Sequence, residues 1–289
     1  MGKETTGFIG LGVMGEPMCR NLALKGGQPM IAFDLNKEPL ARLAADGVEI
    51  APDLASVIAK ADIVFMSLPS GEALSAVAAE ALTGARKGRI YIDLSTSPVL
   101  LTRKLETEFT QRGAAYLDAP VARTREAAIA GTLSIMVGGD RAIFEKTLPL
   151  FRYVASEVTY CGASGAGQAV KILNNMVLFQ TVMALSEALA IGRSVGLDGK
   201  LLFETMAKGS GDSFALRNHG LKSMIPGVFP ERAFSVKYAR KDLHYALELA
   251  TVAGLDVASA NLVDRTFERA IAAGFGDQYH PVISKIIGS

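Results

Sequence analysis

The chain has 289 residues, of which 49% are hydrophobic and 20% are charged, a composition typical of a globular protein with a sizeable core. It carries 30 Lys and Arg against 29 Asp and Glu, so its formal net charge of +1 leaves no basic field to attract nucleic acid or an anionic membrane surface. Cys19 and Cys161 are too few for a disulfide framework and suit a reducing compartment. No apolar run approaches the ~20 residues of a membrane span, and the N-terminus leads into a strand without a signal peptide. We therefore expect a cytoplasmic protein that binds neither nucleic acid nor a membrane.

The chain begins with a strand at residues 6–10, a glycine-rich turn, a helix at 16–25 and a second strand at 30–34. The turn reads Gly10, Leu11, Gly12, Val13, Met14, Gly15. This is the G-x-G-x-x-G signature in the strand, turn, helix and strand context that a dinucleotide-binding unit requires. A glycine-rich turn in an unrelated α/β protein is the alternative, and the acid that ends the second strand argues against it. We expect all six turn residues to contact the cofactor.

Each part of the signature has a physical reason. Gly10 permits the tight turn, Gly12 lets backbone N–H groups approach a pyrophosphate, and Gly15 allows the helix to pack closely on the strand. The helix N-terminus supplies partial positive charge. Asp34 is placed to hydrogen-bond the ribose hydroxyls and would repel a 2′-phosphate. The motif therefore predicts NAD, in preference to NADP, as the cofactor.

Strands and helices alternate through the first 163 residues. Further strands are expected at 62–68, 89–95, 114–121, 132–137 and 157–161, and further helices at 36–46, 53–60 and 141–155, with a short helical piece after residue 125. This alternation predicts an α/β domain with a Rossmann-type, doubly wound and mostly parallel sheet over residues 1–163. Residues 164–289 follow only helical patterns, at 167–193, 198–208, 213–224, 234–253 and 258–272, which predicts an all-α domain for substrate binding and oligomerisation. The long helix at its start joins the two domains.

Ligands bind at the carboxyl ends of strands in an open parallel sheet. Leu68 and Pro69 follow one predicted strand, and Ser95 and Thr96 follow another, so these four residues are expected to line the cofactor cleft. Ser97 is expected to be the N-cap of the next helix, with Pro98 at the first helical position.

The long helix carries an unusual polar group. Lys171, Asn174 and Asn175 project toward one side of it, because residues three and four apart are neighbours on a helix. An ammonium beside two carboxamides must find partners or take part in chemistry. Alternatively, Lys171 lies at the helix edge and extends to water. The two Asn on the same face favour a functional role, and we expect the active site beside this helix.

Several ordered blocks resemble the β-hydroxyacid dehydrogenase family, which includes 3-hydroxyisobutyrate dehydrogenase and tartronate semialdehyde reductase. The blocks are residues 10–15 with Met18, Asn21 and Leu22, then 93–96, 118–121, 131–133 with 136–139, 165–175 and 241–243. The resemblance covers essentially the whole chain. It implies that Lys171 is the catalytic acid/base and that Asn175 orients the substrate or Lys171. It also implies that Thr96 contacts the cofactor and that Lys241 lies near the nicotinamide.

The implied mechanism is a hydride transfer. In oxidation, Lys171 takes the proton of a primary alcohol while a hydride moves to nicotinamide C4, and in reduction Lys171 returns the proton. Lys has a reference pKa near ~10.4, so a useful base needs that value lowered by desolvation or a neighbouring cation. The apolar helix and Lys241 are candidate sources of these effects.

One segment departs from the family pattern. Many relatives follow Asp-Ala-Pro-Val with Ser-Gly-Gly, which holds the substrate carboxylate, but here the positions are Ala122, Arg123 and Thr124. The Arg-Thr pair resembles the sulfolactaldehyde reductase branch, where the resemblance implies sulfonate recognition. A guanidinium offers a bidentate fork for such an oxyanion. Alternatively, Arg123 points to solvent or pairs with Glu126. We assign substrate contact to these three residues and to Ser95 and Asn174.

The remaining candidate residues give little evidence of a functional role. His219, His244 and His280 have no metal-binding or triad spacing, so no metal site is predicted. Asp118 is expected to be structural and to fix the turn before Pro120.

The resemblance implies an NAD-dependent oxidoreductase that interconverts a small anionic 3-hydroxy acid and its semialdehyde, as a homodimer or homotetramer. Sulfolactaldehyde reductase and a non-catalytic dinucleotide-binding module are the alternatives. Imine reductases share the fold, but they commonly replace the Lys that stands at position 171.

Overall fold

A computed structural model describes residues 4–231 and 233–287, so Met1 to Lys3 of the expected N-terminus lie outside the described part. The chain divides into two compact units, Met1–Lys171 and Ile172–Ser289. The division falls inside one continuous helix, α8 (Ala166–Ser194). The sequence-based boundary after residue 163 lies just before this helix.

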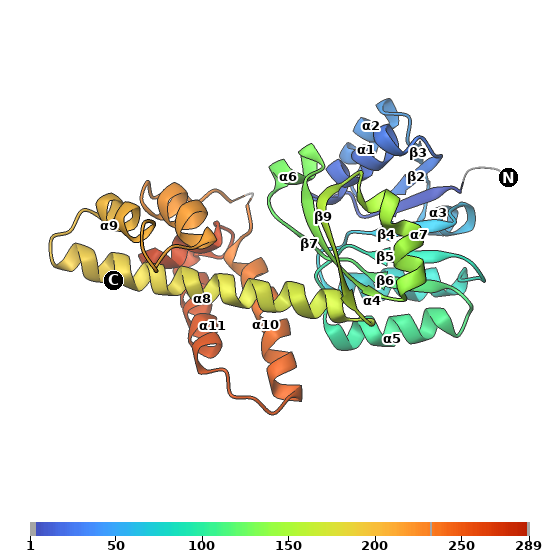
Figure 1. The fold of residues 1–289 in the computed structure, drawn as a ribbon. Coiled ribbons are helices and arrows are strands. Elements are labelled where there is room, and N and C mark those ends of the chain that lie inside the picture. The colour runs from blue at the N-terminus through green and yellow to red at the C-terminus, as the bar shows by residue number, and fades with distance from the viewer. Residues whose placement is uncertain (1–3, 232, 288–289) are drawn as a thin grey trace. The chain divides into compact units, whose positions relative to one another are not determined.

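The first unit contains a nine-stranded sheet in the order β3-β2-β1-β4-β5-β6-β8-β7, with β9 paired to β8 (Figure 1). All pairs are parallel except β6 with β8 and β7 with β8. The strands are β1 (Thr6–Ile9), β2 (Met30–Phe33), β3 (Glu49–Ile50), β4 (Ile63–Met66), β5 (Ile90–Asp93), β6 (Ala115–Asp118), β7 (Val121–Ala122), β8 (Leu133–Gly139) and β9 (Ala155–Gly162). The chain order reverses direction across the sheet at β1, between β2 and β4, which is where a doubly wound sheet binds its ligand.

Helices cover both faces of this sheet, because successive strand residues point to opposite sides. Phe8 belongs to one apolar core and its neighbour Ile9 to the other. The first core joins the sheet to α1 (Gly15–Gly26), α2 (Lys37–Ala45), α6 (Arg125–Ala130) and α7 (Arg141–Phe151). The second joins it to α3 (Leu54–Lys60), α4 (Gly71–Thr83) and α5 (Val99–Thr110). Burying one large apolar side chain, such as Phe8 or Ile9, stabilises the folded protein by about 1.5–3 kcal/mol. The predicted doubly wound α/β domain is confirmed.

Three local predictions need correction. The helix expected to reach residue 155 ends at Phe151, because Ala155 already pairs with Leu133 in the sheet. Helix α4, which follows Ser70, was not expected; the Ser70 hydroxyl accepts a hydrogen bond from the Ala73 N–H and so caps its N-terminus.

The third correction concerns Ser97, which is not an N-cap. Helix α5 begins at Val99 with Pro98 in the N-cap position. The Ser97 hydroxyl instead donates to Asp93 Oδ2 at 2.8 Å. The Ser97 hydroxyl therefore binds the buried Asp93 carboxylate and does not cap the N-terminus of α5.

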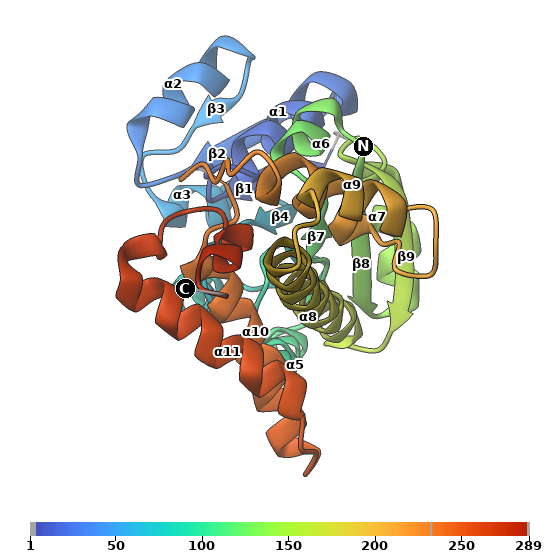
Figure 2. The ribbon, with the colours of Figure 1, turned by 90° about the vertical axis from the view of Figure 1, so that its left-hand side faces the viewer.

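The second unit is helical, as predicted, and its core is built on α8. Phe179, Val182, Leu185 and Leu189 of α8 are buried against apolar side chains of the surrounding helices. These are α9 (Gly199–Met206), η1 (Leu216–Met224, π-helical), α10 (Val236–Val252), α11 (Ala258–Ala270), η2 (Ile271–Phe275) and the 3₁₀ segment η3 (His280–Lys285). Helices α10 and α11 lie side by side (Figure 2).

Helix α8 is long and apolar enough to cross a membrane by length and composition alone, contrary to the sequence-based expectation. Of its most apolar 18-residue window, 44% is buried inside the protein. A long helix at the centre of an apolar core has the same composition, so this property is weak evidence for a membrane span.

Candidate active site

The glycine-rich turn between β1 and α1 has the shape that a dinucleotide needs. Gly10 adopts a φ of 90°, and a Cβ there would collide with the Ser67 carbonyl oxygen. A Cβ on Gly15 would overlap the Gly10 carbonyl oxygen. Gly12 differs, because a Cβ there would meet no atom within 4 Å. Gly10 and Gly15 are therefore required by the fold itself, whereas Gly12 faces open space.

Asp34 connects the end of β2 to this turn. Its Oδ2 accepts a hydrogen bond from the Leu11 N–H, and its Oδ1 accepts one from the Asn36 N–H at 2.7 Å. The Leu11 side chain is buried in the core, and its backbone N–H is the group that donates to Asp34. Val13 is largely exposed, and Met14 is half-buried.

A pocket of about 500 Å³ opens beside Asp34, lined mainly by apolar groups of β2, α2 and the segment after β3. Its lining includes Phe33, Asp34, Leu35, Ile50 and Pro52. An apolar slot with one carboxylate at its edge fits the adenine and ribose of a dinucleotide.

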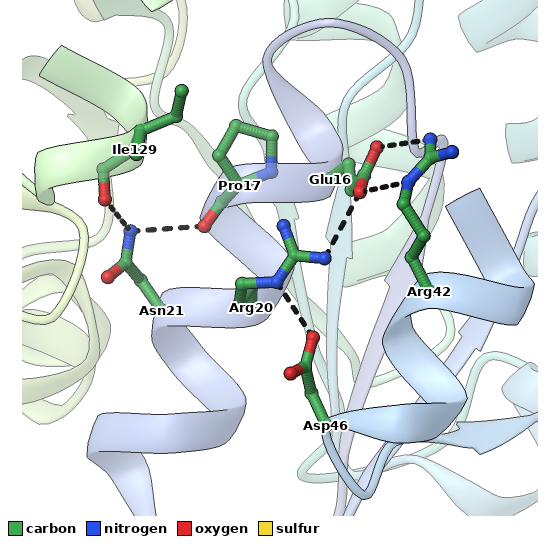
Figure 3. Close-up of polar contacts among 7 residues, drawn as sticks. All are labelled: Glu16, Pro17, Arg20, Asn21, Arg42, Asp46 and Ile129. Atoms are coloured by element: carbon green, nitrogen blue, oxygen red, sulfur yellow. Dashed lines mark hydrogen bonds and ion pairs between the residues drawn. The ribbon is translucent and has the colours of Figure 1, made fainter. Parts of the chain in front are cut away.

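The first turn of α1 is held in place by an ion-pair network with α2 (Figure 3). Glu16 accepts hydrogen bonds from Arg42 at 2.8 Å and from Arg20 at 3.2 Å, and Arg20 also pairs with Asp46 at 2.7 Å. Hydrogen bonding from Arg42 is the main reason that the pKa of Glu16 is lowered, so this carboxylate stays charged. The network fixes α1, and with it the N-terminus that faces the turn.

The carboxyl end of β5 leads into a buried polar cluster that also contains Gln168, from the first turn of α8. The Gln168 Nε2 donates to the Ser95 carbonyl oxygen at 2.8 Å and to Ser97 Oγ at 3.0 Å, while its Oε1 accepts from the Ser97 N–H at 3.1 Å. Asp93 accepts from the Ser95 N–H at 2.9 Å. Burial raises the pKa of Asp93 to about 6.

Asp118 is structural, as predicted, but it holds a different element from the turn before Pro120. Its Oδ1 accepts from the Gly165 N–H at 2.8 Å and its Oδ2 from the Gln168 N–H at 2.9 Å. These are unpaired donors at the start of α8, where a negative charge is favourable. Burial raises the pKa of Asp118, and these backbone hydrogen bonds oppose the shift. Asp118 thereby fixes the helix turn that precedes Lys171.

The three polar residues singled out in the sequence all lie on α8, but their exposure differs. Lys171 is half-buried, Asn174 is exposed and Asn175 is 2% exposed. The Asn175 Nδ2 donates to Asp242 Oδ2 at 2.8 Å, and the other Asp242 oxygen pairs with Lys241 Nζ at 3.0 Å. Lys241 Nζ also lies 5.3 Å from the centre of the Tyr245 ring. Asn175, Asp242 and Lys241 therefore form one polar chain between α8 and α10.

The loop at residues 122–124 has an unexpected backbone. Arg123 has a φ of 88° and is the only non-glycine residue with positive φ in the described part of the chain. Its Nη1 donates to the Thr132 carbonyl oxygen at 2.6 Å and to Ser156 Oγ at 2.8 Å. Arg123 is exposed, in line with the solvent-facing alternative to substrate contact, but its hydrogen bonds to Ser156 of β9 and to Thr132 were not expected from the sequence. Thr124 is the N-cap position of α6, and Ala122 is half-buried in β7.

One of the four residues at the ends of β4 and β5, Ser95, makes a structural hydrogen bond. Ser95 is 4% exposed, and its hydroxyl accepts a hydrogen bond from the Leu68 N–H at 2.8 Å, which ties the end of β4 to the end of β5. Leu68 and Thr96 are half-buried, and Pro69 is exposed. Ligand contact by these four residues stays a prediction.

Three polar residues of this site had no role in the sequence analysis. Gln168 and Asp242 belong to quoted motif blocks, but their buried partners lie 71 and 67 residues away in the chain. Asn21 lies in the first block and reaches residues 128 and 129. Each is a polar residue on the apolar side of a helix, which is the one signal that marks it before the structure is known. In the described residues, no group of three or more His, Cys, Asp or Glu could hold a metal ion.

Both units match known protein families. Residues 5–162 match the family described as the NAD binding domain of 6-phosphogluconate dehydrogenase. Residues 165–287 match the family described as the NAD-binding domain of NADP-dependent 3-hydroxyisobutyrate dehydrogenase.

Relatives and solved structures match nearly the whole chain. A 2-(hydroxymethyl)glutarate dehydrogenase of Eubacterium barkeri is 34% identical, over 97% of this chain and 93% of the relative. An NAD-dependent L-serine dehydrogenase of Pseudomonas aeruginosa is 32% identical, over 96% of each chain. The structure of Mycobacterium tuberculosis 3-hydroxyisobutyrate dehydrogenase with L-serine has a TM-score of 0.90 and 30% identity, covering 98% of this chain and 99% of that one. The chain therefore belongs to the β-hydroxyacid dehydrogenase family, and it is an NAD-dependent oxidoreductase that acts on the CH–OH group of hydroxy acids.

Proposed function

We propose that this enzyme interconverts a small 3-hydroxy acid of the form HOCH₂–CHR–COO⁻ and its semialdehyde. The substrates named for the relatives, 2-(hydroxymethyl)glutarate, 3-hydroxyisobutyrate and L-serine, share a primary alcohol on the carbon next to a carboxylate-bearing carbon. They differ in the group R, which is an acid, a methyl or an ammonium. A common reacting end with a variable side group supports the substrate class without selecting R.

Lys171 is the proposed general acid/base. The observation that carries this assignment is the buried Asn175 amide, which Asp242 holds at 2.8 Å one helical turn from Lys171 on α8. Since Asn175 gives an N–H to Asp242, its side-chain oxygen is oriented away from that carboxylate. This oxygen accepts a hydrogen bond from Asn174 Nδ2 at 3.4 Å, and its second lone pair can orient a donor such as an alcohol or ammonium. Asp242 also neutralises Lys241, so one carboxylate organises both side chains.

The chemistry divides between the cofactor and the chain. NAD, when bound, accepts or supplies the hydride at nicotinamide C4. In oxidation Lys171 Nζ removes the alcohol proton, and in reduction it returns that proton to the alkoxide oxygen. Asp118 and Gln168 hold the first turn of α8 to the strand ends, so the helix that carries the ammonium is rigid.

The proposed cofactor contacts come from the turn, the strand ends and Lys241. They are Gly10, Leu11, Gly12, Val13, Met14, Gly15, Asp34, Leu68, Pro69, Thr96 and Lys241. The proposed substrate contacts are Ser95, Ala122, Arg123, Thr124 and Asn174. Arg123 is the residue of this set that could favour a sulfonate head group, as in sulfolactaldehyde reductases, but its Nη1 donates to the Thr132 carbonyl oxygen and Ser156. The carboxylate substrate is therefore the first choice.

A turnover panel tests the proposal. Purified enzyme is assayed with NAD and 3-hydroxyisobutyrate, L-serine, 2-(hydroxymethyl)glutarate, glycerate and 2,3-dihydroxypropane-1-sulfonate, with NADH formation recorded at 340 nm. We expect kcat/KM to be highest for one of the carboxylates. Preference for the sulfonate would instead select the sulfolactaldehyde reductase alternative, and NAD binding without turnover of any compound would select the non-catalytic module.

A homo-oligomer is also proposed. Large apolar side chains are exposed on the helical unit, including Ile191, Val195, Leu201 and Phe214, of which Phe214 is 62% exposed. Burying such side chains against a second copy is favourable. Light scattering coupled to size-exclusion chromatography tests this, and a mass of 30.5 kDa in dilute solution would contradict it.

A further inference from the structure

Asn21 links the cofactor-binding helix to the segment after the proposed substrate loop (Figure 3). It lies on α1, is 8% exposed, and its Nδ2 donates to the Ala128 carbonyl oxygen at 2.8 Å and to the Ile129 carbonyl oxygen at 3.2 Å. It also donates to the Pro17 carbonyl oxygen, one turn earlier on α1, at 3.1 Å. One side-chain amide thus serves two helices that are more than 100 residues apart in the chain.

The direction of this contact is determined by chemistry. All three facing groups are carbonyl oxygens, which only accept hydrogen bonds, so the side chain must present its NH₂ group. The carbonyls of Ala128 and Ile129 belong to the last turn of α6, a helix of 6 residues. Carbonyls in a last turn have no partner within their own helix. Asn21 therefore gives the Ile129 carbonyl a donor and adds a shorter hydrogen bond to the Ala128 carbonyl, which also accepts from the Gly131 N–H at 3.3 Å.

The segment from Ala122 to Thr132 is anchored at both ends. At its start, β7 pairs with β8, and the Arg123 guanidinium donates to the Thr132 carbonyl oxygen. At its end, the Thr132 N–H donates to the Ala127 carbonyl oxygen at 2.8 Å. These contacts close the segment on itself, and Asn21 adds hydrogen bonds between α1 and α6, which also share an apolar core.

The fit between α1 and the end of this segment is tight. A Cβ on Gly131, which follows α6 with a φ of 72°, would meet Lys25 Nζ of α1 and the Tyr153 carbonyl oxygen. Lys25 donates to that same carbonyl at 3.2 Å. The end of the Lys25 side chain of α1 thus packs against Gly131, the C-cap residue of α6.

We infer that Asn21 is a positioning residue that couples dinucleotide binding at the N-terminus of α1 to the conformation of the substrate loop. The inference rests on the proposed function for its view of residues 122–124 as substrate contacts. The coupling itself runs through Asn21, Ala128 and Ile129. When the dinucleotide binds at the turn before α1, α1 becomes more ordered. The hydrogen bonds from the Asn21 side-chain amide then stabilise α6 and the residues that precede it.

Hydrogen exchange on the full-length protein tests the coupling without any substrate. If opening of the loop is incompatible with bound NAD, NAD at 100 times its Kd slows exchange of the amides of residues 124–132 by up to about 100-fold. The slowing should vanish in Asn21→Asp at pH 8, because a carboxylate faces carbonyl oxygens and donates nothing. At pH 5 the introduced carboxyl group, once protonated, can donate one hydrogen bond, so part of the slowing should return.

Two further variants separate coupling from general damage. Asn21→Ala has no titratable group and should show no return at pH 5. Leu24→Ala, at an exposed position of the same helix, should leave the slowing intact. In turnover assays, Asn21→Asp should raise the substrate KM at pH 8 with a smaller change in the Kd for NAD.

The inference is overturned if NAD leaves exchange of residues 124–132 unchanged in the wild-type protein, a result that holds even if every Asn21 variant fails to fold. It is also overturned if Asn21→Asp responds to NAD at pH 8 as the wild type does. The proposed function fails differently: the wild type would turn over no hydroxy acid, while the exchange response to NAD persisted.

Discussion

Asp93 and Asp118 occupy directly paired positions on the neighbouring parallel strands β5 and β6, and both side chains are fully buried. Gln168 joins them, because its backbone N–H donates to Asp118 and its Nε2 lies 3.4 Å from Asp93 Oδ2. Removal from water raises the pKa of both carboxyls, to about 6 for Asp93. The start of α8, and thus the helix turn that carries Lys171, rests on two carboxyls that are costly to ionise.

A pH dependence of stability follows from Asp93. Its folded pKa of about 6 lies above the ordinary 3.8, so the folded state binds this proton more tightly than the unfolded state. The contribution of this group to stability is therefore largest below pH 4 and falls by about 3 kcal/mol as the pH rises to 6. Asp93→Asn should flatten the slope of unfolding free energy between pH 4 and 6, measured by urea denaturation.

Asp118 shifts in the same direction, so some slope should remain in that variant. Asp277→Asn is the control, because this carboxylate is exposed beside Lys237 and its loss should leave the slope unchanged. An Asp93→Asn protein with the full wild-type slope would contradict the assignment of the proton to Asp93.

Lys171→Ala should lower kcat by about 10²–10⁴-fold, the usual contribution of a general acid/base, while NAD binding is retained. Lys171→Arg keeps a positive charge but cannot give up its proton near neutral pH, so it should be equally inactive. The measurements are kcat for the best panel substrate and Kd for NAD by isothermal titration. Near-normal turnover in either variant would refute the role of Lys171.

Asp242→Asn tests the polar chain on α10. The change is isosteric, but it removes the charge that neutralises Lys241 and replaces one of the two oxygens, which pair with Lys241 and Asn175, by an NH₂ group that cannot accept. Breaking a buried pair by changing one partner costs several kcal/mol in general, so we expect both a lower melting temperature and a large loss of kcat. Asp264→Asn, which breaks an ion pair between α10 and α11 instead, should lower stability while kcat falls much less.

The glycines of the turn should separate folding from cofactor binding. Gly15→Ala places a methyl on the Gly10 carbonyl oxygen and should destabilise the folded protein itself. Gly12→Ala meets open space, so stability should change by less than ~1 kcal/mol while NAD affinity falls by about tenfold or more. Thermal melts and NAD titrations of the two variants check this. A strong loss of stability in Gly12→Ala without a loss of NAD affinity would contradict the proposed role of Gly12.

Cofactor choice should depend on Asp34 alone among the residues at the end of β2. Asp34→Asn removes the negative charge yet keeps a side-chain oxygen to accept the Leu11 N–H. We expect the ratio of kcat/KM with NADP to that with NAD to rise. Asp34→Ala loses the acceptor as well, so activity with both cofactors should fall. An unchanged ratio in Asp34→Asn would show that other groups exclude the 2′-phosphate.

Local sequence patterns were sufficient for much of this architecture. The spacing of Gly10, Gly12, Gly15 and Asp34 determined a dinucleotide-binding turn, because backbone conformation and phosphate chemistry admit few other residues at those places. The apolar, glycine-free run after Gly167 determined one long helix, and the placing of Lys171 and Asn175 one turn apart followed from helix geometry.

What the sequence could not decide are contacts between residues far apart in the chain. Ser97 has the pattern of an N-cap, yet a buried Asp93 takes its hydroxyl. Arg123 has a guanidinium that can bind an anion, yet in the fold it donates hydrogen bonds to the Thr132 carbonyl oxygen and to Ser156 of β9. A buried polar group must find partners wherever the fold places them, so only the tertiary structure could assign Asn21 to α6, Asp118 to α8 and Asp242 to Asn175.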